Sequence, residues 1–308
     1  YPSGKKKRFR LPWQYFERID AIVVKHGKRD SINEAFRVLR TNTSFVMGGE
    51  QNVAIITSYN PGSGKSFIIN NLAACFALKD KKVLLIDADP QANASSGLGV
   101  EIRDLKNTIY ECLVNQIDPH TAILPTSFQN LHIIPSHIDL VGAEIEMLNL
   151  PNRENLLKNV LKPLETEYDY ILIDCSPSLG LITVNALTAS HSVIIPVQCE
   201  FFALEGIAKL LNTIKIIKSK LNPALSIEGF LLTMYDARLR LANQIYEEVK
   251  RHFQKLVFDT VIQRNIRLSE APSYGLPALL YSPDSKGSIN YMMLARELLA
   301  KHHDTIKN

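Results

Sequence analysis

Short runs of apolar and β-branched residues alternate along the chain with longer segments whose apolar positions recur at helical spacing. The alternation is regular from Val53 to about residue 235. Continuous apolar runs of this length are typical of strands buried in a parallel sheet. The predicted strands cover residues 53–57, 82–89, 131–135, 170–174, 192–197 and 228–233.

The segments between these runs predict amphipathic helices, because their apolar residues fall on one helical face. The first predicted helix begins with a capping box formed by Ser31 and Glu34. The predicted helices cover residues 31–47, 66–79, 152–164, 203–221, 241–253 and 288–301. This alternation predicts an α/β fold with a doubly wound, mostly parallel sheet and helices on both faces. We expect residues 1–30 to be a basic tail and residues 31–308 to form one domain.

The composition is that of an ordinary globular protein, with 46% hydrophobic and 21% charged residues among 308. No run approaches the roughly 18 apolar residues of a membrane-spanning helix, and the basic N-terminal end lacks the apolar part of a signal peptide. We therefore expect a cytoplasmic protein. Cys75, Cys112, Cys175 and Cys199 are widely spaced, which favours buried, reduced thiols.

The net charge of +4 comes from the N-terminal end. Five basic residues and no acid lie within residues 1–10, so the rest of the chain carries a net charge of −1. A nucleic-acid surface would therefore be a local basic patch. The basic end itself is either a solvated arm or a contact for a membrane surface or polyanion.

Residues 58–66 read Ser-Tyr-Asn-Pro-Gly-Ser-Gly-Lys-Ser and lie between a predicted strand and a predicted helix. In this setting backbone N–H groups and the helix dipole favour an anion. Lys65 would reach the β- and γ-phosphates of a nucleoside triphosphate, and the Ser66 hydroxyl would bind Mg²⁺. The expected nucleotide-binding residues are Pro61, Gly62, Ser63, Gly64, Lys65, Ser66 and Phe67. Because Tyr59 replaces the first glycine of the strict motif, a simple glycine turn with a surface lysine is the alternative.

Two further segments favour the nucleotide site. Asp87 and Asp89 end one apolar run and Asp174 ends another, so all three acids would lie at the edge of a parallel sheet where ligands bind. Mg²⁺ prefers one or two carboxylates together with phosphate oxygens and water. We expect Ser66 and Asp87 to support the metal, with Asp174 in its outer shell.

The expected chemistry is in-line attack of water on the γ-phosphate of ATP. Lys65 and Mg²⁺ would stabilise the developing charge, and Asp89 would position the attacking water. Lys65 and Asp89 are therefore the predicted catalytic residues. No side chain in these motifs is a strong general base, which suits a slow ATPase.

Four segments stand out from about residue 83 onward: LIDADPQANASSGLG at 85–99, DYILIDCSPSLG at 169–180, YDAR at 235–238 and RNIRLSEAPSYG at 264–275. Through these segments this part of the chain resembles the ParA/Soj chromosome-partitioning ATPases of the deviant Walker A group. The resemblance implies an ATP-dependent dimer that binds DNA without sequence preference on the nucleoid, and hydrolysis stimulated by a ParB-type partner. It also implies that Asp89 promotes hydrolysis and that Arg238 and Arg267 contact DNA, with Arg240 and Lys250 as possible neighbours. Without the resemblance, such arginines are ordinary surface charges.

The N-terminal part of the chain contains IVV at 22–24, DSINEAFRVLRTN at 30–42 and SYNPGSGKS at 58–66. Through these segments residues 19–80 resemble the cytoplasmic catalytic domain of bacterial tyrosine kinases. In that family an E-x-x-R-x-x-R helix, here Glu34, Arg37 and Arg40, assembles a ring. A tyrosine kinase is therefore the alternative function, although Tyr274, Tyr281 and Tyr291 are scattered rather than clustered as kinase targets. A membrane organiser of the MinD type is a third possibility, but residues 288–301 fit core packing better.

One departure from the ParA pattern concerns the start of the loop. Those proteins carry a lysine that contacts ATP across the dimer, and Asn60 stands at the matching position here. An amide donates hydrogen bonds to phosphate but carries no charge. Nucleotide binding through Lys65 should survive this change, whereas the ATP-bridged dimer and its hydrolysis are in doubt.

Overall fold

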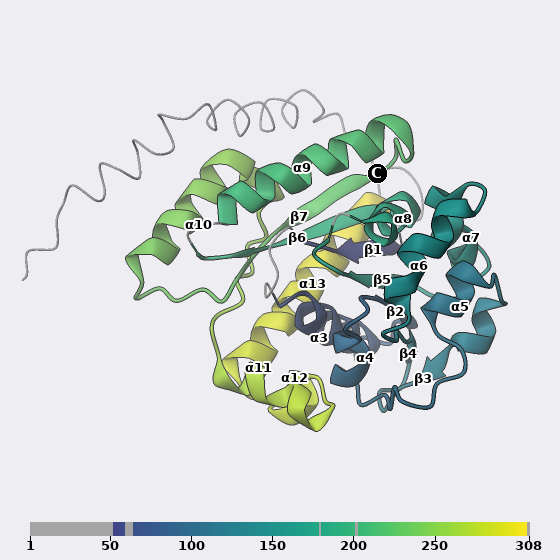
Figure 1. Cartoon of the computed structure of the whole chain (residues 1–308). Coiled ribbons are helices and arrows are strands. Elements are labelled where there is room, and N and C mark those ends of the chain that lie inside the picture. The colour runs from purple at the N-terminus through teal and green to yellow at the C-terminus, as the bar shows by residue number, and fades with distance from the viewer. Residues whose placement is uncertain (1–51, 59–63, 179, 201–202, 307–308) are drawn as a thin grey trace, which may run out of the picture. The chain divides into compact units, whose positions relative to one another are not determined.

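The computed structural model describes residues 52–58, 64–178, 180–200 and 203–306 (Figure 1). Three sequence predictions fall outside these ranges. They are the basic tail over 1–30, the helix with Glu34, Arg37 and Arg40, and the loop residues Asn60, Pro61, Gly62 and Ser63. They stay predictions.

The described residues form a seven-stranded sheet in the order β3-β4-β2-β5-β1-β6-β7. Neighbouring strands are parallel except for the short edge strand β3, which runs antiparallel to β4. The doubly wound, mostly parallel sheet predicted from the sequence is thereby confirmed. The strands are β1 Val53–Ile56, β2 Val83–Ala88, β3 Leu124–Pro125, β4 Leu131–Ile134, β5 Tyr170–Cys175, β6 Ser192–Gln198 and β7 Ser226–Thr233.

Helices connect the strands, and several of them are short. The α-helices are α3 Lys65–Ala77, α4 Asn93–Gly97, α5 Ile109–Val114, α6 Leu140–Glu146, α7 Leu156–Leu161, α8 Leu181–Ala189, α9 Ala203–Lys220, α10 Arg240–Phe253, α11 Ile266–Glu270, α12 Ala278–Tyr281 and α13 Lys286–Ile306. The 3₁₀ turns are η1 Pro119–Ala122, η2 Met147–Asn149, η3 Arg153–Asn155, η4 Gln254–Leu256 and η5 Ala271–Tyr274.

The helix predicted over 152–164 is shorter in the structure. Asn152 has a positive φ of 52°, which a continuing helix excludes, and a 3₁₀ turn follows it. The regular helix α7 therefore spans only Leu156–Leu161. The other predicted helices within the described ranges agree with α3, α9, α10 and α13 to within a few residues.

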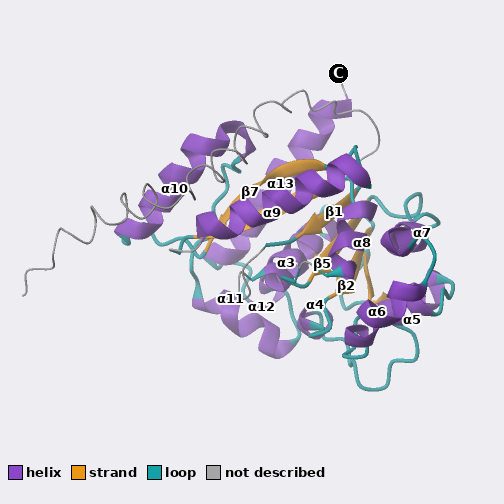
Figure 2. Ribbon diagram, turned by 45° about the horizontal axis from the view of Figure 1, so that its top comes forward, coloured by secondary structure: helices purple, strands orange, loops and turns teal. Residues whose placement is uncertain are grey.

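The core lies on both faces of the sheet. On one face, α3 and α13 pack side by side, and Leu72, Phe76 and Leu294 meet strand residues such as Leu85 and Leu172. Helices α8 and α9 pack on strands β1, β5 and β6 from the other face. Figure 2 shows the strands between these helices. The alternating orientation of side chains along each strand supplies apolar residues to both layers.

Strands β2, β5 and β1 are neighbours, so the loops that follow them meet at one edge of the sheet. Asp87 on β2 is paired in register with Asp174 on β5. Leu85 and Leu172, two residues earlier, pack in the cluster that includes α3, so both acids point toward the same face. The fold thereby places two carboxylates near the beginning of α3.

Two predictions about cellular chemistry can be compared with the structure. All four cysteines are buried and free, as the sequence suggested. Among the helices of the described ranges, none is both long and apolar enough to cross a bilayer.

Candidate nucleotide-binding site

The loop after β1 ends at Gly64, which immediately precedes α3. Gly64 has φ 73° and ψ 25°, a left-handed conformation that favours glycine. Space is not the constraint, because a Cβ here would lie 3.8 Å from Met234 Cε, an ordinary contact. No side chain caps the first turn of α3 within the described residues, and that turn contains no acid. Its N–H groups and the helix dipole are thus available to an anion.

Lys65 is the first residue of α3 and is buried, with 6% of its surface exposed. Burial lowers the pKa of its ammonium group, while Asp174 and Asp89 act in the opposite direction. The lysine therefore lies close enough to both acids to feel their charge. A phosphate group placed on the N-terminus of α3 would add a third anionic partner for this cation.

Asp174 ends β5 and is 1% exposed. Burial raises the pKa of its carboxyl group well above the usual range, and the neighbouring Asp87 raises it further. Ser66 is near enough to lower that pKa, yet neither carboxylate oxygen accepts a hydrogen bond of normal geometry from the residues that the structure describes. A buried carboxylate with both oxygens unpartnered, beside a serine hydroxyl, fits the hard oxygen ligands that Mg²⁺ prefers.

Asp87 ends β2 and is fully buried, but its surroundings differ from those of Asp174. One oxygen, Oδ1, accepts the Asp89 N–H at 3.2 Å. The other, Oδ2, accepts the Ser95 N–H at 2.8 Å and the Ser95 hydroxyl at 2.7 Å. Burial raises the pKa of Asp87 to about 6 even though these donors lower it.

Asp89 lies in the turn between β2 and α4 and is 7% exposed. Its Oδ1 accepts the Gln91 N–H at 3.0 Å, and its carbonyl accepts the Ala92 N–H at 2.9 Å. Ala92 has a positive φ of 49°, so the turn is tight. These bonds hold the Asp89 carboxylate within electrostatic reach of Lys65.

Phe67 packs away from the expected phosphate position. Its ring meets that of Tyr291 on α13 edge-to-face, with 5.8 Å between centroids. Any contact of Phe67 with a nucleotide would therefore come from its backbone N–H. Tyr291 is only 2% exposed, in agreement with the core packing predicted for residues 288–301.

The predicted DNA-contacting arginines belong to a different part of the molecule. Arg238 follows β7 and pairs with Asp236, and its side chain is 87% exposed. Arg267 lies on α11, pairs with Glu270 at 2.8 Å, and has a side chain 58% exposed. The structure does not bring either arginine to the acids at the sheet edge.

Residues without a predicted role also shape the site. Ser95 is the clearest, because it supplies two of the bonds to Asp87. The sequence indicates this role only indirectly. Ala92 precedes α4 and has no side-chain oxygen to cap the helix, so the N–H groups of its first turn need an acceptor from elsewhere. Met234, after β7, lies beside Gly64 and accepts a bond from Gln198 at 3.2 Å between Nε2 and Sδ.

Comparison with known proteins identifies the family. The family model described as AAA domain (AAA_31) matches residues 51–227. The chain is 52% identical over 248 residues to the sporulation initiation inhibitor protein Soj of Bacillus subtilis, covering 80% of this chain and 98% of that protein. It is 48% identical over 256 residues to the chromosome partitioning protein ParA of Myxococcus xanthus, covering 83% and 90%. The family match also takes in residues 51–82, whereas the tyrosine kinase resemblance of the N-terminal part stays a prediction.

Solved structures agree with this assignment. Cobyrinic acid a,c-diamide synthase from Mycobacterium smegmatis, with bound ADP and magnesium, aligns with a TM-score of 0.71 at 32% identity over 81% of this chain and 94% of that one. The septum site-determining protein MinD from Pyrococcus horikoshii, in complex with Mg-ADP, aligns with a TM-score of 0.68 at 28% identity over 80% and 95%. Together with the sheet edge described above, these similarities show that the chain belongs to the ParA/Soj family of chromosome-partitioning P-loop ATPases.

Proposed function

We propose that this ATPase is an ATP-controlled, dimerising DNA-binding switch that acts in chromosome or plasmid partitioning. The observation that carries the proposal is a direct packing contact between the segment bearing Arg267 and the helices of the nucleotide site. Such a contact gives the bound nucleotide a short physical route to the DNA-binding surface.

The nucleotide in this proposal is ATP with Mg²⁺. Lys65 and the N–H groups of α3 would bind the phosphates, and Ser66 and Asp174 would hold the metal. Magnesium, when bound, neutralises charge on the β- and γ-phosphates. Asp89 would orient the attacking water, because its turn holds the carboxylate near Lys65. The two solved structures with magnesium and adenine nucleotides support this choice of ligands.

The route from nucleotide to DNA surface runs through two contacts. Gly99, after α4, and Gly275, after η5, approach each other so closely that a Cβ on Gly275 would lie 2.8 Å from Gly99 Cα. The Ala278 N–H donates to the Asn71 side chain at 2.8 Å, which ties α12 to the buried face of α3. The segment from α11 to α12, with Arg267, is therefore anchored on both helices that follow site loops.

The DNA surface would combine Arg267 with Arg238, and with Arg240 and Lys250 on α10. Arg238 and Arg267 are exposed and each is paired with a nearby acid. The Arg267–Glu270 pair, with both side chains exposed, contributes little to stability, roughly 0–1 kcal/mol, so a phosphate can replace the acid as partner. Binding through phosphates alone gives no sequence preference.

The dimer would form through the edge of the sheet that carries the site. Ile138, Val141, Ile145 and Leu148 are spaced along and beside α6 so that they share one face, and each is more than half exposed. Helix α6 lies against the segment after Asp174, because a Cβ on Gly180 would come within 1.9 Å of Glu144 Oε1. A second copy of the chain on this face would therefore contact the nucleotide loops. The family also implies a ParB-type partner that stimulates hydrolysis.

The test is binding of the chain to a DNA duplex of arbitrary sequence, with and without a nonhydrolysable ATP analogue and Mg²⁺. The wild-type protein should bind DNA only with the analogue, and its mass by light scattering should double under the same conditions. Lys65→Ala removes a charge-assisted contact to phosphate and should weaken analogue binding by about 100-fold. Analogue-independent DNA binding, or none at all, would contradict the proposal.

A further inference from the structure

Two buried aspartates lie side by side at the sheet edge and differ in the hydrogen bonds that their carboxylates accept. Asp87 and Asp174 are paired in register on neighbouring parallel strands. Asp87 accepts hydrogen bonds on both oxygens, from the Asp89 N–H and from the N–H and hydroxyl of Ser95. Within the described part of the chain, Asp174 accepts none on either oxygen.

We propose that Asp87 is not a magnesium ligand but a positioning residue, which caps α4 and fixes the turn that presents Asp89. The proposal rests on the role of Asp89 in orienting the attacking water, as given under the proposed function. It replaces the expectation from the sequence that Asp87 shares the metal with Asp174.

The capping role follows from the start of α4. Ala92 occupies the cap position with φ 49° and has no side-chain acceptor. The Ser95 N–H, at the third position of this helix, needs an acceptor, and Asp87 Oδ2 provides it at 2.8 Å. Asp87, five positions before the cap residue, thus accepts the N–H bond that a serine or aspartate at the cap position accepts in other helices.

The hydrogen bonds around Asp87 and Ser95 fix the position of α4. The Ser95 hydroxyl donates to Asp87 and accepts the Ser136 N–H at 3.2 Å, which adds the end of β4 to the network. On the other side, the Asn70 amide of α3 donates to the Ala94 carbonyl at 3.0 Å. Asn70 also packs so tightly that a Cβ on Gly97 would lie 2.6 Å from its Nδ2. Helix α4 is therefore held between β2, β4 and α3.

The same bonds argue against a metal role for Asp87. Oδ2 already accepts two donors, so it could bind a cation only by leaving the Ser95 N–H or hydroxyl without an acceptor, and Oδ1 is oriented by the Asp89 N–H. Asp174 can bind a cation without that loss, since neither of its oxygens accepts a hydrogen bond from residues 52–58, 64–178, 180–200 or 203–306. The Asp89 N–H bond to Asp87 Oδ1 also means that any shift of Asp87 would move the backbone of Asp89.

The experiment separates magnesium affinity from turnover in Asp87→Asn, Ser95→Ala and Asp174→Asn. Magnesium affinity is measured as the half-saturating Mg²⁺ concentration for binding of a fluorescent, nonhydrolysable ATP analogue, and turnover is measured as kcat. Asp87→Asn should lower kcat by about tenfold or more and leave the Mg²⁺ half-saturation unchanged. Ser95→Ala should act in the same direction by a smaller factor. Asp174→Asn should raise the half-saturating Mg²⁺ concentration by about tenfold or more.

Matched variants make each result decisive. Ser190→Ala removes a buried serine hydroxyl, bonded to the Ala186 carbonyl, from the far end of α8, and should leave kcat unchanged. A raised Mg²⁺ half-saturation in Asp87→Asn, like that in Asp174→Asn, would overturn the inference. Unchanged kcat in Ser95→Ala would also overturn it, and this variant serves if Asp87→Asn fails to fold. Unchanged kcat in Asp89→Ala would instead contradict the role of Asp89 in the proposed function, whatever the magnesium data show.

Discussion

The nucleotide edge of the sheet and the arginine surface around α10 and α11 use charge in different ways. At the edge, Lys65, Asp87 and Asp174 are all buried, and burial changes the pKa of each group. On the surface, Arg238 and Arg267 are exposed and pair with acids two or three residues away. In the first region the charges are shielded from water, whereas in the second the arginine side chains remain accessible to it.

This difference decides what each region can do. A buried charge that lacks a full set of partners destabilises the protein, and a ligand that pairs with it removes this cost. The nucleotide edge should therefore respond strongly to ATP and Mg²⁺. Exposed pairs are worth little and are screened by salt, so the surface suits contacts that form and break quickly. A switch needs both regions and a rigid connection between them. The Gly99–Gly275 contact is the tightest part of that connection.

The first prediction breaks this connection. Gly275→Ala places a Cβ 2.8 Å from Gly99 Cα at a position with φ 64°, so both contact and backbone oppose it. We expect unfolding stability to fall by about 2–4 kcal/mol and Tm to fall by roughly 5–10 °C. ATP-dependent DNA affinity should fall further than analogue affinity, measured by thermal unfolding and by binding titrations.

Gly142→Ala is the matched control for Gly275→Ala. Gly142 lies within α6 at an ordinary helical φ, and a Cβ there would meet only the end of the flexible Glu146 side chain. Alanine is the better helix former by about 1 kcal/mol, so Tm should stay equal or rise. If Gly275→Ala shows the same result as this control, the Gly99–Gly275 contact does not constrain the two segments.

Arg267 provides the test of the exposed surface. Arg267→Ala should weaken DNA binding by roughly 3–10-fold at low salt and reduce the slope of log K against log salt by about one unit. Glu270→Gln releases Arg267 from its partner and should raise DNA affinity slightly. Filter binding at several salt concentrations measures both effects. Arg153→Ala, in η3 beside α7, is the control, because it removes another paired surface arginine and should leave the slope unchanged. If it weakens DNA binding as much as Arg267→Ala does, DNA binding depends on general charge and not on the α10–α11 surface.

The sequence was sufficient for the central strands because they are buried on both sides. An apolar run such as 170–174 has no other stable place, and β5 begins at the predicted residue. The short helices were harder. Helix α8 is apolar around most of its surface and shows no helical period, and α4 is capped by Asp87 from outside its own segment. Neither helix could therefore be predicted from the pattern of its own residues.

The candidate site divides in the same way. Lys65, Ser66, Asp87 and Asp174 could be placed together because the ends of parallel strands converge on one edge. Which acid is free for a metal could not be predicted. In our proposal it depends on Ser95 of α4, whose hydroxyl donates to Asp87 and accepts the Ser136 N–H from just after β4. Tertiary hydrogen bonds of this kind assign roles that strand periodicity does not contain.

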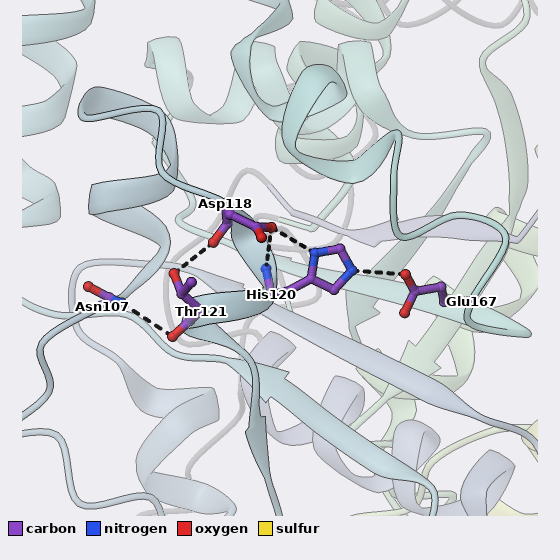
Figure 3. Close-up of polar contacts among 5 residues, drawn as sticks. All are labelled: Asn107, Asp118, His120, Thr121 and Glu167. Atoms are coloured by element: carbon purple, nitrogen blue, oxygen red, sulfur yellow. Dashed lines mark hydrogen bonds and ion pairs between the residues drawn. The ribbon is translucent and has the colours of Figure 1, made fainter.

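An exposed charge cluster far from both regions gives the smallest effect. His120 lies in η1 between two carboxylates, with Nδ1 2.7 Å from Asp118 and Nε2 2.8 Å from Glu167 (Figure 3). Its hydrogen bonds to Glu167 and Asp118 raise the pKa of the imidazole above 6.5. The cluster joins η1 to the turn before β5, and its side chains are 42–63% exposed.

The third prediction follows from the sign of that pKa shift. A histidine whose folded pKa is raised stabilises the protein fully below its unfolded pKa, and this contribution is lost as pH rises through the folded pKa. His120→Gln should therefore lower Tm at pH 5.5 by no more than about 3 °C, because solvent limits the contribution to about 1 kcal/mol or less. At pH 8.5 the Tm of the variant and the wild type should agree. Glu167→Gln should lower the pKa of His120, which an NMR titration measures directly. An equal Tm difference between His120→Gln and the wild type at both pH values would show that packing, and not charge, accounts for the effect of the histidine.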